Sequence, residues 1–433
     1  MMRGLRLWRE RRRHPGRYAR LAQLLPIQSM SRAELLHRQR RDLDAIVRFA
    51  AAQTDFYAAR LGVLLPPDDR LIDPTRLPVL AKQDVIDHMH GMLARNADRA
   101  SVKVGHTGGS TGKPMAFFYD DAKHELMLAG MLRGFMMSGW RPGQRVLYFW
   151  GATRDVAPGG VFARDGDGLL GTERALEAVE YSEARLAGWV HTIRRWRPTL
   201  LYGYASALTE LARFVVEQRL RLRAPLLGVY STAELLHEGQ RTLMEQAFGC
   251  KVYNQYGCRE VPNIAWECRH GQMHVFSDLV YLESLPVDGE DRLLVTSLTN
   301  RLMPFIRYDL GDTGRLLEGE CSCGLPFPLM QMDMCRHNDL IRTRGGTRLH
   351  PTYFNRLLYG LTQISQYQWV QIAPDRLQLN LVSKQHLPAE TVRQIEAHIR
   401  RDVDAQMVLE INYRAELARS RAGKHRFVIG LGD

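Results

Sequence analysis

The spacing of apolar residues changes along the chain, and each change predicts a different kind of element. From Ser31 to Leu61 apolar residues recur at helical spacing, and they do so again over 82–93 and 121–138. Between about 145 and 256, short apolar runs alternate with helical segments, which is typical of a doubly wound α/β unit. The strands expected in that unit are 145–150, 200–202, 226–230 and 251–253, and the helices are 182–195, 205–217 and 234–247.

Two further shifts of pattern divide the rest of the chain. From His274 to Arg315 the sequence has β character. After Cys335 it mixes expected strands (341–343, 367–372, 377–382 and 407–413) with expected helices (352–358 and 389–403). This mixture predicts a small α+β domain. We therefore expect three parts: an arm at 1–30, a large domain at 31–334 and a small C-terminal domain at 335–433.

Composition and charge narrow the classes of function. The 433 residues carry a net charge of +12, and residues 1–20 hold eight arginines against the single acid Glu10. Two readings of this start remain open: a solvated, partly frayed helix, or an amphipathic basic arm for a membrane surface. No nucleic acid is expected as a partner, because no helix-turn-helix, zinc-finger or RNA-recognition signature is present. No apolar run is long enough to span a membrane, and no signal-peptide pattern opens the chain. The six cysteines suit a reducing cytoplasm.

The stretch Gly105–Pro114 combines four glycines, three hydroxyl residues and one lysine between two expected strands. Glycines let a backbone approach a ligand closely, and successive N–H groups in such a loop can cradle an anion. Thr107 stands where a P-loop needs glycine, and Pro114 stands where it needs Ser or Thr, so the stretch is not a P-loop. From these residues alone, the stretch is either a phosphate-binding loop or a surface turn.

Four further motifs follow this loop in a fixed order. They are Ser231-Thr232-Ala233-Glu234, Tyr256-Gly257-Cys258-Arg259-Glu260, Arg307-Tyr308-Asp309-Leu310-Gly311-Asp312 and Ser420-Arg421-Ala422-Gly423-Lys424-His425-Arg426. Each motif is weak alone, but the ordered set resembles the adenylate-forming superfamily of acyl-CoA synthetases. Within that superfamily the chain looks most similar to the branch of phenylacetate–CoA ligases, CapK and coenzyme-F390-synthetase-like proteins. The resemblance covers nearly the whole chain. It implies a large AMP-binding domain and a small, mobile lid domain.

The resemblance also implies a role for individual residues. The loop would cradle the β- and γ-phosphates of ATP through Thr107, Gly108, Gly109, Ser110, Thr111, Gly112 and Lys113. Tyr256 would lie beside adenine, Ala233 and Glu234 would form the neighbouring wall, and Asp312 would accept hydrogen bonds from the ribose hydroxyls. Arg336 would lie near the nucleotide at the domain junction, with a hinge at Asp339. Lys424 would contact the reacting carboxylate and the α-phosphate.

Glu260 is the expected ligand for Mg²⁺, a hard cation that prefers carboxylate and phosphate oxygens. This chain departs from the family pattern immediately before it, because Arg259 stands where the family usually has Thr or Ser. An arginine there either competes with Mg²⁺ or pairs with the phosphates. His106 flanks the loop and is given no role.

Cysteine and histidine residues form a second candidate site. Cys268, His274, Cys321 and Cys323 make a Cys₃His set, and some members of the branch carry a structural zinc at such positions. His270 is an alternative to His274 as the ligand. The other interpretation is that these are free cysteines of a cytosolic protein.

These observations leave three hypotheses of function. The first is ATP-dependent activation of a small carboxylic acid, followed by acyl transfer to a thiol, expected to be coenzyme A. The second is CapK-like adenylation with transfer to an amine or hydroxyl. The third is an inactive, basic protein of the same fold that binds an anionic partner or membrane surface.

Five aromatic residues near two expected strands either line a pocket for an aromatic acid or belong to the core; they are Tyr148, Phe149, Trp150, Tyr202 and Tyr204.

Overall fold

The computed structural model describes most of the chain, and its described residues fall into two compact units. The described residues are 2–62, 64–67, 70–107, 115–150, 169–287, 290–334, 341–349, 353–354, 357–358, 361, 363–383, 385–417 and 428–431. Unit 1 contains Met1–Thr107, Met115–Gln144 and Tyr253–Cys335. Unit 2 contains Gly108–Pro114, Arg145–Val252 and Arg336–Asp433. The expected arm, large domain and lid remain a prediction.

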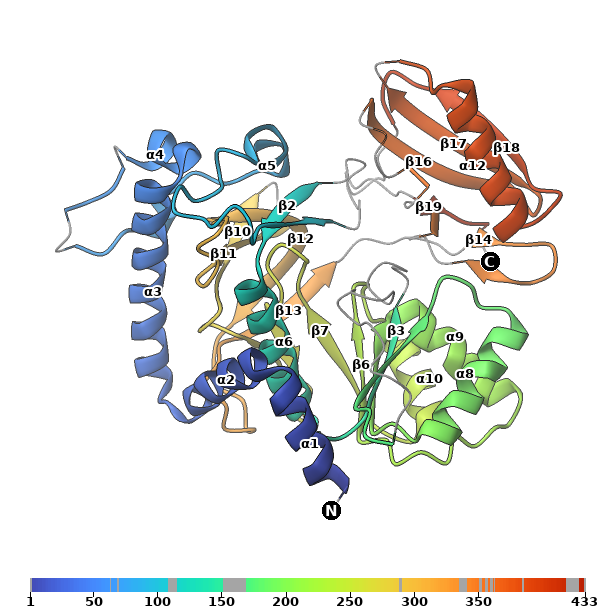
Figure 1. Ribbon diagram of the computed structural model, residues 1–433, viewed down its shortest axis with the longest axis horizontal. Helices are drawn as coiled ribbons and strands as arrows, with labels where there is room; N and C mark the ends of the chain where they lie inside the picture. The colour runs from blue at the N-terminus through green and yellow to red at the C-terminus, as the bar shows by residue number, and fades with distance from the viewer. Residues whose placement is uncertain are drawn as a thin grey trace. The chain divides into compact units, whose positions relative to one another are not determined.

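Unit 1 combines N-terminal helices with an antiparallel sheet (Figure 1). Its helices are α1 (Met2–Arg13), α2 (Pro15–Leu24), α3 (Arg32–Gln53), α4 (Asp55–Leu61), α5 (Lys82–His88) and α6 (Asp121–Met136). Its strands are β1 (Lys103–His106), β2 (Ala116–Tyr119), β7 (Val252–Tyr256), β8 (Ala265–Glu267), β9 (Met273–Val275), β10 (Val280–Val287), β11 (Glu290–Ser297), β12 (Tyr308–Leu317) and β13 (Leu329–Met334). Strands β10, β11, β12, β13, β9, β8 and β7 are neighbours in that order. The expected β character after His274 is therefore confirmed.

Helix α6 packs closely on this sheet. A Cβ at Gly134 would lie 2.2 Å from the Trp266 ring, so glycine is the residue that lets the helix approach β8. The rings of Phe135 and Trp266 meet edge to face with their centres 5.4 Å apart. Beside them, the buried Arg133 guanidinium makes two hydrogen bonds to Asp278, at 2.7 and 2.9 Å. The Nε of Arg133 has no hydrogen-bond partner among the described residues, so the pair satisfies the guanidinium only in part.

The helix expected over 31–61 is two helices. Thr54 has an extended backbone and its hydroxyl accepts a hydrogen bond from Tyr57 N at 3.1 Å, so it caps α4 and ends α3. The helix expected over 82–93 ends at His88. The N-terminal segment forms two ordered helices, and α2 buries Arg17, Leu21 and Leu24.

Unit 2 begins with a parallel sheet that carries helices. The elements are β3 (Val146–Trp150), β4 (Glu173–Glu177), α8 (Glu183–Trp196), β5 (Leu200–Tyr204), α9 (Ala205–Glu217), β6 (Gly228–Thr232) and α10 (Glu238–Phe248). Strand β5 pairs in parallel with β3 and β6, and β3 pairs in parallel with β4. Residues of α8, α9 and α10 share one core with Leu147, Phe149 and Val229 (Figure 1). The expected α/β unit is confirmed.

The C-terminal part of unit 2 is α+β, as expected. It contains β14 (Ile341–Arg342), β15 (Arg348–Leu349), β16 (Ile364–Ala373), β17 (Arg376–Ser383), α12 (Ala389–Asp402), β18 (Val408–Tyr413) and β19 (Val428–Ile429). The sheet order is β18-β17-β16-β19. Trp369, Leu379 and Ile399 lie in its core. Within the helix expected over 352–358, residues 353–354 are helical and 357–358 form a turn, and residues 352, 355 and 356 lie outside the described residues.

Among the described helices, none has the length and apolar character needed to cross a membrane.

Candidate nucleotide site and cysteine–histidine cluster

The glycine-rich stretch is framed by a β-hairpin, as its flanking alternation predicts. Strands β1 and β2 pair antiparallel, with Gly105 opposite Phe117. Thr107 is buried and closes the hairpin: its N–H donates to Met115 O at 2.9 Å, and its hydroxyl accepts from Met115 N at 3.2 Å. The remaining predicted phosphate contacts, Gly108, Gly109, Ser110, Thr111, Gly112 and Lys113, lie outside the described residues.

The structure brings two predicted nucleotide residues together in unit 1. Tyr256, the last residue of β7, donates its hydroxyl hydrogen to Asp312 Oδ2 on β12 at 3.0 Å. The two residues are 56 positions apart in sequence. An aromatic ring and a carboxylate thus lie side by side. This pair has the chemistry of a nucleoside site, since the ring can stack on a base and the carboxylate can accept from hydroxyl groups.

Glu260 lies in the turn after β7 and is buried. Its Oε1 accepts a hydrogen bond from the hydroxyl of Tyr308 at 3.2 Å, so a second tyrosine holds a second carboxylate of the predicted site. Tyr308 belongs to a motif that the sequence analysis used, but it was given no role there. A carboxylate held in this way fits a hard cation such as Mg²⁺.

Two cationic side chains lie close to this turn. Lys123, on α6, donates from Nζ to Glu260 O at 2.8 Å, and burial lowers the pKa of this lysine to about 8. Its ammonium also lies 4.8 Å from the centre of the Phe117 ring. Arg259 donates from Nη1 to His106 O at 3.4 Å, at the base of the hairpin that carries the glycine-rich loop. Sequence reasoning missed Lys123, because nothing in the pattern of α6 distinguishes it from a surface lysine.

The predicted nucleotide wall, Ala233 and Glu234, lies in unit 2. Ala233 has a φ of +66°, a conformation that a residue with a Cβ adopts at a cost. The Glu234 carboxylate accepts hydrogen bonds from Ser206 N at 2.7 Å and from Ser206 Oγ at 3.2 Å. It therefore caps the first turn of α9 from outside the helix. For this reason the helix expected over 234–247 begins only at Glu238.

One buried hydroxyl next to that wall has no partner among the described residues. Ser231 Oγ, on β6, is fully buried and makes no hydrogen bond within the part of the chain that the structure describes. Buried polar groups are normally paired, so this hydroxyl is a candidate ligand contact. Arg336, Asp339 and Lys424 lie outside the described residues.

The five aromatic residues of β3 and β5 mostly form core. Phe149 is fully buried and its ring centre lies 5.0 Å from that of Trp189. Phe149 and Tyr204 belong to the core shared with α8 and α9. Tyr148 and Tyr202 are also buried and meet edge to face, with 5.7 Å between their ring centres. Packing in the core therefore accounts for these residues without a role in lining a pocket for an aromatic acid.

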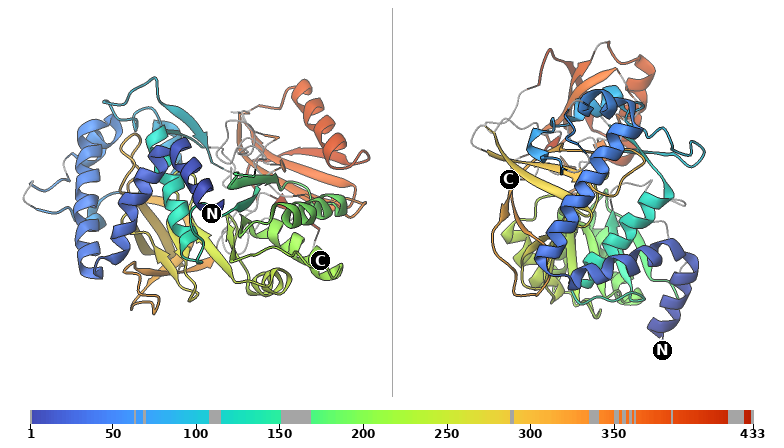
Figure 2. Two further views of the ribbon diagram at one scale, coloured as in Figure 1. Left: turned by 60° about the horizontal axis from the view of Figure 1, so that its bottom comes forward. Right: turned by 90° about the vertical axis from the view of Figure 1, so that its left-hand side faces the viewer.

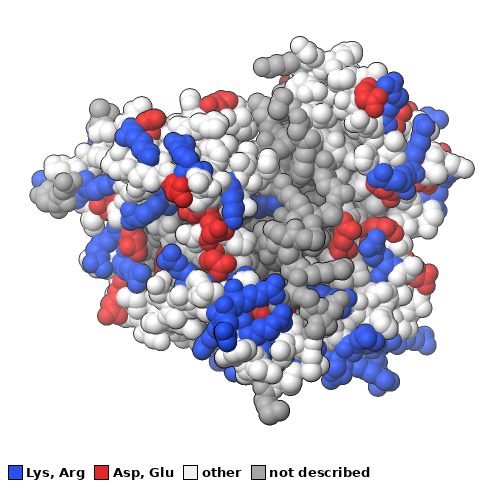
Figure 3. Space-filling view, viewed as in Figure 1, with Lys and Arg blue, Asp and Glu red and all other residues white. Residues whose placement is uncertain are grey.

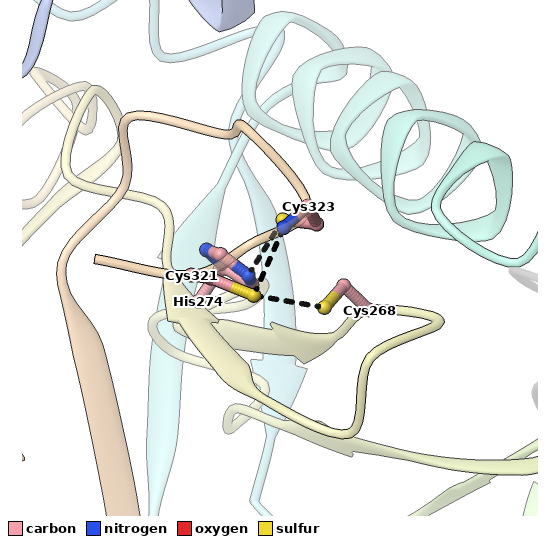
Figure 4. A group of neighbouring side chains, drawn as sticks. All are labelled: Cys268, His274, Cys321 and Cys323. Carbon is pink, nitrogen blue, oxygen red and sulfur yellow. Dashed lines mark hydrogen bonds between the residues drawn. The ribbon is translucent and has the colours of Figure 1, made fainter.

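The four members of the predicted Cys₃His set converge at one end of the unit 1 sheet (Figure 4). Their ligand atoms all lie within 4.8 Å of one another. The sulfur atoms of Cys268 and Cys321 are 3.7 Å apart, and Cys323 Sγ is 3.3 Å from His274 Nε2. Tetrahedral zinc with Zn–S bonds of about 2.3 Å separates its ligand atoms by roughly 3.7 Å. The residues present therefore fit a zinc ion.

The structure also distinguishes the two candidate histidines. His274 is fully buried and its ring faces the cysteines, whereas the His270 ring nitrogen pairs with Ser322 Oγ at 2.7 Å. Burial opposes ionisation of the Cys268 thiol. Hydrogen bonds from His274 and from backbone groups nevertheless bring its pKa below the ordinary value. A lowered thiol pKa favours the thiolate, which is the form that binds metal.

Comparison with known proteins agrees with this picture. No protein-family model matches the chain. The chain is 25% identical to a phenylacetate-coenzyme A ligase of Thermus thermophilus over 92% of this chain and 91% of that protein. It is 25% identical to protein CapK of Staphylococcus aureus over 62% of this chain and 60% of that protein.

A solved structure supports the fold. This is 2-hydroxyisobutyryl-CoA ligase in complex with 2-HIB-AMP and CoA in the thioesterification state, with a TM-score of 0.62. It is 20% identical in sequence, and the match covers 93% of this chain and 91% of that chain. By sequence the chain is similar to a phenylacetate-coenzyme A ligase and to protein CapK, and it shares the fold of 2-hydroxyisobutyryl-CoA ligase.

Proposed function

We propose that the protein is an ATP-dependent, AMP-forming ligase that activates a carboxylic acid as an acyl adenylate and transfers the acyl group to coenzyme A. The observation that carries this proposal is the hydrogen bond between Tyr256 and Asp312. It joins two residues that the family resemblance assigns to the base and the ribose of one nucleotide. The similarity to phenylacetate-coenzyme A ligases adds the reaction class.

The reaction has two steps. In the first, a carboxylate oxygen attacks the α-phosphorus of ATP, the bond from that phosphorus to the bridging oxygen breaks, and pyrophosphate leaves. In the second, the thiol sulfur attacks the acyl carbon, AMP leaves with the oxygen that bound it, and the thiol proton passes to solvent. Both steps depend on charge neutralisation and positioning more than on covalent help from the protein.

The residues near Glu260 would neutralise the negative charge of the phosphates. Glu260 would bind Mg²⁺, and Tyr308 would hold its carboxylate in place. The ion would neutralise phosphate oxygens. Because Arg259 already reaches the base of the loop-bearing hairpin, we propose that its guanidinium pairs with the phosphates rather than opposing the metal.

The other assigned roles are part of the same proposal. Thr107, Gly108, Gly109, Ser110, Thr111, Gly112 and Lys113 would hold the β- and γ-phosphates, and Ala233, Glu234 and Arg336 would border the nucleotide. Lys424 would contact the carboxylate and the α-phosphate. Residues 31–334 would form the AMP-binding domain, and residues 335–433 would form the lid that carries Lys424. Residues 1–30 would form a basic N-terminal arm.

A structural zinc ion completes the proposal. Cys268, His274, Cys321 and Cys323 would hold it in a closed site with four protein ligands, which is typical of structural zinc. We also propose a cytoplasmic location, where thiols stay reduced and able to bind metal.

A second acceptor is favoured by the similarity to CapK. In that alternative the acyl adenylate is captured by an amine or hydroxyl instead of a thiol. Product analysis separates the two. Formation of a thioester only when coenzyme A is present supports the ligase, and consumption of the acid with an added amine or sugar but without coenzyme A supports the alternative.

The test of the proposed function is ATP–pyrophosphate exchange over a panel of aryl and aliphatic acids. We expect exchange with at least one acid, and we expect Lys424→Ala to lose most of it. Exchange by Lys424→Ala at the wild-type rate would show that this lysine does not act in adenylation. Failure to bind ATP in calorimetry would overturn the proposal as a whole.

A further inference from the structure

Helix α1 turns two large apolar residues, Leu5 and Trp8, away from the protein. Leu5 is 47% exposed and Trp8 is 54% exposed, although Trp is among the residues that gain most from burial. Positions 5, 8 and 12 follow one another at helical spacing and form one stripe. The Arg12 guanidinium lies 4.9 Å from the centre of the Trp8 ring, so the stripe ends in a cation–π pair.

This orientation is fixed by packing on the opposite side of the helix. Gly143 has a φ of +87°, and a Cβ there would lie 2.6 Å from Arg3 O and 3.0 Å from Leu7 Cβ. Glu10, on the same side, is only 2% exposed. Helix α2 follows α1 after His14 (Figure 2). It buries Leu21 and Leu24. The outward stripe is therefore a feature of a docked helix, not of a frayed end.

The exposed side of α1 is strongly basic. Met2–Arg13 contains six arginines and one acid, and that acid is the buried Glu10. At 100° per residue, Arg9 and Arg11 fall on either side of the stripe. Figure 3 shows basic side chains gathered over the N-terminal helices. Apolar residues flanked by arginine on a helix surface define one amphipathic, cationic face.

Three kinds of partner can be compared with this face. Two exposed apolar side chains are too few for a stable second copy, because specific protein interfaces bury about 1,200–2,000 Å². The phosphates of a nucleic acid would pair with the arginines, but Leu5 would stay exposed to water. An anionic bilayer can bind both the apolar side chains and the arginines. The apolar side chains enter the boundary between headgroups and acyl chains, and the arginines pair with lipid phosphates.

We propose that α1 is a membrane-surface anchor that docks the protein on anionic lipids. Leu5 and Trp8 enter the interface, and Arg9, Arg11 and Arg12 bind the negatively charged headgroups. The helix lies in the plane of the surface and does not cross it. The proposal is independent of the ligase reaction, so either can fail without the other.

The test is sedimentation of the full chain with vesicles of phosphatidylcholine, with and without phosphatidylglycerol. We expect binding only to the vesicles that contain phosphatidylglycerol, and weaker binding as salt rises. Leu5→Ser combined with Trp8→Ser should weaken binding about tenfold or more. Leu71→Ser combined with Leu227→Ser changes two leucines of similar exposure elsewhere and should bind as wild type.

A second pair of variants tests the charge. Arg11→Gln with Arg12→Gln should weaken binding about tenfold, whereas Arg99→Gln, which removes an exposed arginine outside the anchor, should not. Circular dichroism and the melting temperature establish that each variant is folded. Three results would each overturn the proposal: no binding by the wild type, equal binding to pure phosphatidylcholine, and wild-type binding by the Leu5/Trp8 variant. Binding to duplex DNA is measured as well. If the wild type binds DNA, and the arginine variant loses both DNA and vesicles while the Leu5/Trp8 variant loses neither, α1 is a general polyanion-binding surface and the proposal is overturned.

Discussion

At the scale of single residues, the candidate site pairs each of its two unit 1 carboxylates with a tyrosine. Tyr256 donates to Asp312, and Tyr308 donates to Glu260. A hydrogen bond to an ionised carboxylate is stronger than one between neutral groups, and it fixes the direction in which the carboxylate points. The carboxylates are thus positioned by the protein before any ligand arrives. This is the arrangement that binding of a nucleotide and a metal ion requires.

Replacing Tyr308 by Phe tests whether that positioning matters. A hydrogen bond to a charged group contributes about 1.5–3 kcal/mol, so we expect Tyr308→Phe to weaken the affinity for MgATP about tenfold or more. Isothermal titration calorimetry measures this affinity directly. Tyr57→Phe is the matched control, because the Tyr57 hydroxyl is also buried but its partners among the described residues are the backbone groups Pro304 O and Ile306 N. That control should lower the melting temperature and leave the affinity for MgATP unchanged. Equal affinity in Tyr308→Phe and wild type would contradict the role of Tyr308.

At the scale of elements, local sequence patterns predicted the helices and strands whose formation depends on residues close in sequence. The alternation around 101–119 predicted the β1–β2 hairpin, and the strand–helix alternation predicted β3, β5, β6 and β7 but not β4. The pattern failed where a distant contact decides the structure. Glu234 reads as the start of a helix, but its carboxylate is engaged by Ser206, and α10 begins later. The partners Lys123 and Tyr308 could not be predicted for the same reason, since both reach Glu260 through long-range contacts.

The cysteine–histidine cluster is the second prediction at this scale. It brings Cys268, after β8, and His274, on β9, together with the two cysteines of the loop before β13. We expect about one zinc per chain in metal analysis, because the donor set is closed and complete. Cys321→Ser should lose the metal and lower the melting temperature, since metal binding adds directly to folding free energy. Cys250→Ser is the control: Cys250 is a free cysteine that packs against the core of unit 2 and is not part of the cluster. Unchanged zinc content in Cys321→Ser would contradict the assignment.

At the scale of the whole molecule, the proposed chemistry needs one active site to perform two different steps. The family resemblance assigns this to rotation of the 335–433 lid about a hinge at Asp339. Proline fixes φ near −65° and so removes the backbone freedom that a hinge uses. We therefore expect Asp339→Pro to retain pyrophosphate exchange and to lose about tenfold or more of thioester formation. Asp339→Ala removes the same carboxylate but leaves φ free, and it should keep both steps. Both rates are read in one preparation, with the melting temperature as the check on folding. If a folded Asp339→Pro protein keeps both steps, the reaction does not depend on rotation at this residue. If it loses both steps equally, Asp339 acts in adenylation itself.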